Sequence, residues 1–251
     1  MGGRGQLSLS SSLHPLTLSF PLLPLSLAAS NITALLFLWA IMPGSSSSAC
    51  MPSLFLERAL FIREREDGLY RPITALVSKM VSELVVAAAV SLAASVPVFY
   101  ACKLGGSFAV FAVGHFVTSA VGAALGSAIA ALAPSMDVAN AALPAYVSTL
   151  LFFVGLLLRP QDMPRWLAWY KYLDFLHFSW AAQMLNQFGG GAGGDGGGGP
   201  LSLDGVNSVL AFYDIPENGD PWVQLGYASL FFWFFAGVAW LALGYKKHER
   251  R

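Results

Sequence analysis

The sequence predicts an all-α membrane protein with about five spanning helices, on the basis of three observations. Apolar residues make up 56% of the 251 residues and charged residues only 11%, whereas soluble domains carry about 25% charged residues. Long windows without Asp, Glu, Lys or Arg recur along the chain, at 5–56, 84–102, 104–136, 138–158 and 221–245. Each window can hold a helix of about 20 residues, the element that satisfies its own backbone in lipid.

The same composition argues against a soluble enzyme, a nucleic-acid binder and a disordered scaffold. The 14 acidic and 14 basic side chains cancel, so the net charge indicates no polyanionic partner. The two cysteines are too few for a disulfide framework.

The first 30 residues differ from the rest of the chain. They are rich in Leu, Ser and Pro, and we interpret 1–30 as an atypical leader or a non-homologous start. An apolar stretch with a small-residue end resembles a signal peptide, whereas Pro15, Pro21 and Pro24 argue against a regular membrane helix. The transmembrane domain then covers 31–251.

Five apolar segments are the predicted spans. They cover 31–51, 73–101, 107–133, 138–158 and 222–244. Pro43 and Gly44 interrupt the first span, and Pro144 is expected to kink the fourth. Gly122 and Gly126 form a G-x-x-x-G pattern in the third span, which permits close helix packing. Only a tight turn separates the third span from the fourth.

Basic residues set the predicted orientation. The loop 52–72 and the C-terminal tail are the most basic connections, so we place both on the cytosolic side. The segment 159–221 is then an outer loop. Its aromatic-rich start favours a pair of short interfacial helices, and its Gly-rich insert 189–199 reads as a flexible linker. This topology puts Cys50 and Cys102 at opposite membrane faces, so we expect two free thiols.

The most informative stretch is the charged segment Leu56–Glu83. Lys79 and Glu83 are four residues apart and are expected to form an ion pair on one helix face. A solvated loop that obeys the positive-inside rule is the simpler interpretation of the remaining charges. The order of the residues favours a more specific one: E-R-x-x-F-x-R-E-R-E-x-G-x-Y runs from Glu57 to Tyr70, and K-x-x-x-E follows.

This order resembles the first cytosolic loop of the G (White) subfamily of ATP-binding-cassette exporters, whose membrane domain is of the ABC-2 type, a type II exporter fold. Residues 152–157 (FFVGLL) are similar to that family's fifth-helix motif, and 164–173 (PRWLAWYKYL) to the segment after it. Ala181–Phe188 matches the pattern A-x-x-x-x-N-x-F. The resemblance covers about 31–251 and corresponds to the family's second to sixth helices, so its first helix and nucleotide-binding domain are expected to be missing.

The resemblance implies roles for three sets of residues. The coupling loop, which docks on the nucleotide-binding domain, comprises Glu57, Arg58, Phe61, Arg63, Glu64, Gly68 and Tyr70. The hydrophobic valve above the cavity comprises Leu156 and Leu157, for which an ordinary lipid-facing leucine run is the alternative. The substrate cavity is lined by Leu38, Ile41, Met42, Ser45, Ala145, Ser148 and Leu151. Ser45 stands where an aromatic clamp would have Phe, which argues against stacking of flat aromatic compounds. The apolar lining with hydroxyls suits lipids, sterols or similar amphiphiles.

The implied function is the transmembrane part of an exporter that moves such lipophilic substrates across a membrane. The sequence has neither G-x-x-x-x-G-K-[ST] nor an LSGGQ-like signature. ATP and Mg are therefore expected on a partner nucleotide-binding domain, and this chain is expected to hold no cofactor, metal or catalytic residue. A standalone ABC-2 permease subunit with a separate ATPase is one alternative, and a non-transporting membrane fragment is another.

The expected partners are the lipid bilayer, a nucleotide-binding domain in cis (missing upstream) or in trans, and a second transmembrane domain in a homo- or heterodimer. Nucleic acid is not expected. The expected location is the plasma membrane or an organelle membrane, as an integral multi-pass protein. A secondary transporter fits less well, because five spans do not divide into inverted halves.

Overall fold

The computed structural model describes residues 22–46, 55–57, 72–156, 168–189, 209–210, 213–216 and 219–245. These residues are mainly helical and include no strand, which confirms the predicted all-α fold. The longer elements are α2 (Leu22–Ser46), α4 (Pro72–Ala101), α5 (Phe108–Leu132), α6 (Met136–Phe153), the 3-10 helix η3 (Ala168–Leu173), α7 (Phe175–Phe188) and α9 (Pro221–Tyr245).

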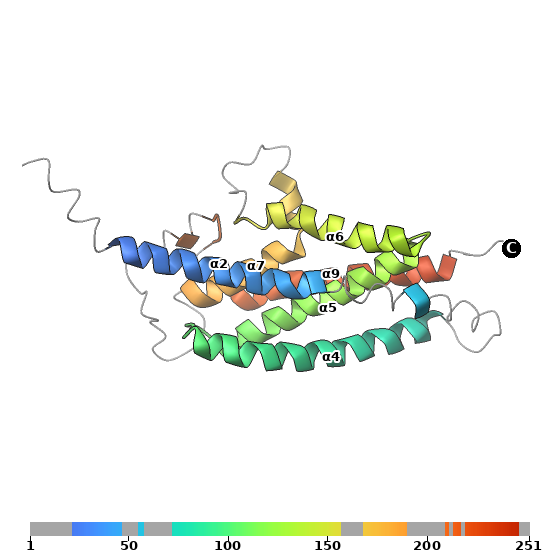
Figure 1. Cartoon of the computed structure of the whole chain (residues 1–251), viewed down its shortest axis with the longest axis horizontal. Helices are drawn as coiled ribbons and strands as arrows, with labels where there is room; N and C mark the ends of the chain where they lie inside the picture. The colour runs from blue at the N-terminus through green and yellow to red at the C-terminus, as the bar shows by residue number, and fades with distance from the viewer. Residues whose placement is uncertain are drawn as a thin grey trace, which may run out of the picture.

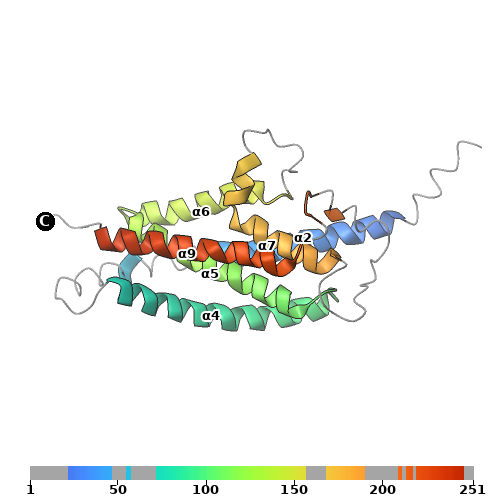
Figure 2. The same cartoon turned by 180° about the vertical axis from the view of Figure 1, so that it is seen from behind.

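Helix α5 is the centre of the bundle. It contacts α2, α4, α6, α7 and α9, and 61% of its apolar window is buried, against 22% for α4, α6 and α9. Figures 1 and 2 show α2 on one side of the bundle and α9 on the other, with α4 and α6 at opposite edges. Many α5 residues are Gly or Ala, and Gly122 and Gly126 are both buried. Small side chains let neighbouring backbones approach closely, which suits a helix surrounded by others.

Four described helices are long and apolar enough to cross a membrane: Leu76–Ala101, Phe108–Leu132, Met136–Phe153 and Pro221–Gly244. A shorter apolar segment, Ala29–Gly44, lies within α2. These five segments fall on the five predicted spans, and they support an integral multi-pass membrane protein.

The first predicted span differs from α2 in its bounds. The helix begins at Leu22 rather than at Asn31, and it ends at Ser46. Pro24 lies in the first helical turn, where a missing backbone N–H costs nothing, so the proline-containing segment can still be helical. Residues 1–21 lie outside the described part, so the interpretation of 1–30 stays a prediction.

The connections at the two ends of the bundle are built differently. Ala133 to Ser135 join α5 to α6 in a tight turn, as predicted, and Ser135 caps α6 by accepting a hydrogen bond from Val138 N at 3.4 Å. The opposite end carries the predicted pair of short helices, η3 and α7. Helix α7 packs against α5, where Thr118 Oγ1 and Ser179 Oγ are 2.6 Å apart. The Gly-rich insert 189–199 lies outside the described residues after Gly189.

Candidate functional site

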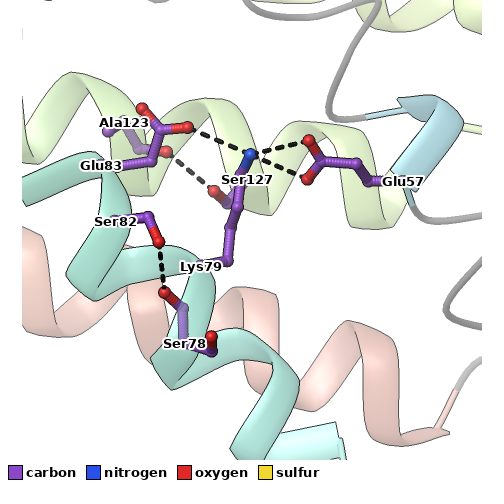
Figure 3. A network of polar contacts seen from close by, with 7 residues as sticks. All are labelled: Glu57, Ser78, Lys79, Ser82, Glu83, Ala123 and Ser127. Carbon is purple, nitrogen blue, oxygen red and sulfur yellow. Dashed lines mark hydrogen bonds and ion pairs between the residues drawn. The ribbon is translucent and has the colours of Figure 1, made fainter. Parts of the chain in front are cut away.

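The first candidate site is an ion-pair network around Lys79 near the start of α4. Lys79 Nζ lies 2.8 Å from Glu57 Oε2 and 3.1 Å from Glu83 Oε1, and it donates a hydrogen bond to Glu57 Oε1 at 2.9 Å. Figure 3 shows the Lys79 ammonium between the two carboxylates. The predicted Lys79–Glu83 pair is therefore confirmed, and Glu57 is an additional partner.

The network joins two segments that are distant in sequence. Glu57 belongs to the helical turn 55–57, whereas Lys79 lies in α4, 22 residues later. One exposed ion pair contributes only about 0–1 kcal/mol, but one cation between two carboxylates restrains both chain segments. The neighbouring hydroxyls donate to backbone carbonyls of their own helices, Ser82 to Ser78 O at 3.0 Å and Ser127 to Ala123 O at 2.9 Å (Figure 3). The turn 55–57 is thus fixed to α4.

Glu57 is the coupling-loop candidate that the described residues include. The candidates outside the described residues are Arg58, Phe61, Arg63, Glu64, Gly68 and Tyr70. The two described ends of the loop, Glu57 and α4, are held together by the Lys79 network.

The second candidate site is the C-terminal end of α6, at the opposite end of the bundle from Lys79 (Figure 1). The helix ends at Phe153, and Val154 is fully buried. Gly155 follows with φ +123°, a conformation that side-chain-bearing residues rarely adopt. Leu156, one of the two valve candidates, is partly buried against the apolar core, and Leu157 lies beyond the described residues.

Helix α7 and η3 surround this end of α6. His177 Nδ1 donates a hydrogen bond to Val154 O at 2.7 Å. A Cβ added at Gly155 would lie 3.0 Å from Trp180 Cζ3, so the indole packs directly on the glycine. Phe153 and Tyr170 pack with ring centroids 4.5 Å apart. Helices η3 and α7 therefore hold the chain on both sides of Val154.

Asp174 is a buried acid at the start of α7. Its side chain is fully buried, and Oδ1 accepts a hydrogen bond from Leu176 N at 2.9 Å. Oδ2 finds no hydrogen-bond donor among the described residues. Burial raises the pKa of Asp174 to about 8, although backbone N–H groups of Leu176 and His177 oppose the shift.

The cavity candidates divide between surface and core. Leu38 and Met42 on α2 are 53% and 56% exposed, and Ala145 and Ser148 on α6 are exposed as well. These two helices contact each other. Leu151 is partly buried, and the Ser45 side chain is not among those described.

Ile41 is different, because it is only 6% exposed and belongs to the apolar core. Its side chain therefore does not contribute to the surface that Leu38 and Met42 share.

The described residues hold no cluster of three or more His, Cys, Asp or Glu that could bind a metal ion. Cys102 is an exposed free thiol, and Cys50 lies outside the described part. The full sequence has no P-loop pattern, and its glycine run at 189–199 is not followed by Lys and Ser or Thr.

Three residues of the second site were not predicted from the sequence: Asp174, His177 and Trp180. Asp174 offered one signal, since Asp directly before an apolar helix is typical of an N-cap. The contacts of His177 and Trp180 with residues 154 and 155 have no sequence pattern that reveals them.

This arrangement of apolar spanning helices, with an ionic network at one end and short helices at the other, defines a multi-pass membrane domain. Residues 7–188 match the family described as ABC-2 type transporter, which is most of the chain. The chain belongs to this family.

Curated relatives come from fungi and a plant. The chain is 24% identical to the ABC multidrug transporter atrH of Aspergillus oryzae over 160 residues, which is 62% of this chain and 11% of that protein. It is 24% identical to ABC transporter G family member 18 of Arabidopsis thaliana over 141 residues, 55% of this chain and 20% of that protein. It is 23% identical to the ABC multidrug transporter A-2 of Aspergillus fumigatus over 158 residues, 62% of this chain and 10% of that protein. The chain thus spans a small part of the length of these relatives.

Proposed function

We propose that this chain is the transmembrane part of an ABC exporter that moves lipophilic compounds, with ATP hydrolysed on a nucleotide-binding domain outside this sequence. The family membership and the G-type relative support a transporter membrane domain. Two of the relatives are named multidrug transporters, which supports apolar compounds as substrates. The exposed cavity candidates, Leu38, Met42, Ala145 and Ser148, offer an apolar surface with one hydroxyl and no charge.

The Lys79 network is the observation that carries the coupling role. In this proposal the loop 52–72 touches the nucleotide-binding domain and transmits its movement to the membrane helices. The loop is joined to α4 by the chain itself, and the contact of Glu57 with Lys79 adds a second connection between the loop and this helix. In the proposed dimer, two copies, or this chain and a related one, face each other through the surface formed by α2 and α6. Leu156 and Leu157 of both subunits would then meet and close the substrate path.

The test compares inside-out membrane vesicles from cells that contain the chain with vesicles from cells that lack it. We expect ATP-dependent uptake of dehydroergosterol or rhodamine 6G only where the chain is present. The uptake should stop with a non-hydrolysable ATP analogue and continue with a protonophore.

A protonophore-sensitive uptake that ignores ATP would contradict the proposal and favour secondary transport. Equal uptake with and without the chain would favour a non-transporting membrane fragment. ATP-dependent uptake that copurifies with a separate ATPase chain would support the permease arrangement of the same function.

A further inference from the structure

The end of α6 leaves backbone groups that the helix itself cannot satisfy. The last carbonyls of an α-helix have no intrahelical partner and need another donor when they are buried. Val154 is fully buried at this position, and its oxygen accepts from His177 Nδ1 at 2.7 Å. A carbonyl oxygen only accepts, so Nδ1 carries the hydrogen, whichever state Nε2 adopts.

The hydrogen bond matters because the next residue is a glycine. Gly155 has φ +123° and sits immediately before Leu156. Glycine permits more backbone conformations than any other residue, so an unrestrained Gly155 could redirect the chain after α6. Two contacts restrain it in the structure: the His177 bond to Val154 O on one side and the Trp180 indole against Gly155 itself.

Helix α7 is well placed to act as a rigid support. Trp180 is fully buried and makes an edge-to-face contact with Phe37 of α2, with ring centroids 6.2 Å apart. A second edge-to-face contact joins Trp180 to Tyr213 at 5.1 Å. The His177 ring therefore extends from a helix that is anchored to the rest of the bundle.

We propose that His177 is a positioning residue, which holds the Val154 peptide and so sets the direction of Leu156 at the proposed valve. The inference rests on the proposed function for the valve itself. In addition, a single N–H donor on α7 determines whether the Leu156 side chains of two subunits meet. Loss of the donor leaves Val154 O buried without a partner and releases the glycine that follows it.

The test uses disulfide formation between two copies of the chain. Cys50 and Cys102 are first replaced by Ser, and Leu156→Cys is introduced in the full-length chain in membranes. Copper phenanthroline should cross-link Leu156→Cys across the dimer. We expect His177→Phe, which keeps an aromatic ring but no donor, to slow this cross-linking about fivefold, as expected for one lost buried hydrogen bond.

The rescue variant is His177→Asn, whose amide N–H can take the place of Nδ1–H and should restore the cross-linking rate. Ser148→Cys, exposed on α6 and two turns from Leu156, is the positional control and should respond equally in all backgrounds. If His177→Phe fails to fold, His177→Leu takes its place.

The possible results separate the two proposals. If Leu156→Cys does not cross-link with His177 intact, the valve of the proposed function is wrong. If it cross-links at the same rate with His177→Phe, the valve stands and the positioning role is wrong. A loss in His177→Asn equal to that in His177→Phe, or a parallel loss at Ser148→Cys, would also overturn the positioning role.

Discussion

Asn186 of α7 and Ser107 at the start of α5 hold each other by two reciprocal hydrogen bonds. Asn186 Nδ2 donates to Ser107 O at 3.0 Å, and Ser107 N donates to Asn186 Oδ1 at 2.9 Å. The Asn186 amide thus pairs with a backbone residue as a neighbouring strand would. Gly106, with φ +82°, allows this approach, because a Cβ there would overlap Asn186 O. The asparagine of the A-x-x-x-x-N-x-F pattern therefore fastens α7 to the central helix.

Replacing Asn186 by Ala should destabilise the protein by about 2–3 kcal/mol. Both hydrogen bonds are lost, and the partly buried Ser107 N–H is left without its acceptor, whereas Ser107 O still accepts from Phe111 N at 3.3 Å. The measurement is the thermal or denaturant unfolding of the detergent-purified protein, followed by tryptophan fluorescence. Gln187→Ala, at the half-buried next position, is the control and should change stability by less than about 0.5 kcal/mol. If both substitutions lower the free energy of unfolding equally, the two hydrogen bonds of Asn186 make no specific contribution to stability.

The Lys79–Glu57 pair should show a measurable but small coupling energy. A double-mutant cycle with Lys79→Gln and Glu57→Gln is expected to give about 0.5–1 kcal/mol, because the side chains are 27% and 48% exposed. The coupling should weaken as salt is raised toward 1 M. Lys171 pairs instead with Asp214 at 3.1 Å, at a distant site, so the cycle of Lys171→Gln with Glu57→Gln should be additive. If the Lys79 cycle is additive as well, the two side chains do not stabilise each other, and the proposed role of this ion pair in coupling is wrong.

Asp174 should make the protein less stable as the pH rises. Burial raises its pKa from 3.8 to about 8, so between these values the folded protein keeps a proton that the unfolded chain has lost. The free energy of unfolding therefore falls from about pH 4 to about pH 8 and is level above it. Asp174→Asn keeps an oxygen for Leu176 N but cannot ionise, and it should remove this part of the pH dependence.

The measurement for Asp174 is the unfolding midpoint at a series of pH values. At pH 8.5 Asp174→Asn should unfold at a higher temperature than the native protein, with each kcal/mol shifting Tm by about 2–4 °C. Parallel pH curves for the native protein and Asp174→Asn would contradict the burial argument.

The features that the sequence predicted correctly depend on local spacing. Uncharged windows of helix length lead directly to the spanning helices, and the four-residue step from Lys79 to Glu83 places both side chains on one face of α4. The bounds of α2 were harder to predict, because prolines weaken a helix in its interior but are tolerated in its first turn.

The missed features depend on contacts between distant residues. Glu57 reaches Lys79 across 22 positions, and His177 reaches Val154 across 23. Such partners become neighbours only after the helices have packed, and neither residue differs in type from an ordinary surface residue. The burial of Asp174 has the same origin, since Asp before a helix is usually a solvated cap. The fold was thus predictable from periodicity and charge, whereas the residues around the proposed valve required the packed structure.

Gly155 provides a final test, because backbone strain and steric overlap can be separated there. Gly155→Ala should destabilise the protein by about 1–3 kcal/mol, since φ +123° is unfavourable for any residue with a Cβ. The new methyl group would also press on Trp180 Cζ3 at 3.0 Å. Gly226→Ala is the matched control: its added Cβ meets nothing within 4 Å in α9, so alanine should stabilise the helix by about 0.5–1 kcal/mol.

A second background distinguishes the two causes at Gly155. Trp180→Phe removes the outer ring that carries Cζ3, so it relieves the overlap and leaves the backbone conformation unfavourable for alanine. If strain dominates, Gly155→Ala should cost nearly the same in the Trp180→Phe background as in the native one. If overlap dominates, the cost should largely disappear, and the two substitutions would show a coupling energy above about 0.5 kcal/mol in unfolding measurements. A neutral Gly155→Ala in both backgrounds would mean that the chain after α6 readily adopts another path, which is incompatible with a fixed direction for Leu156.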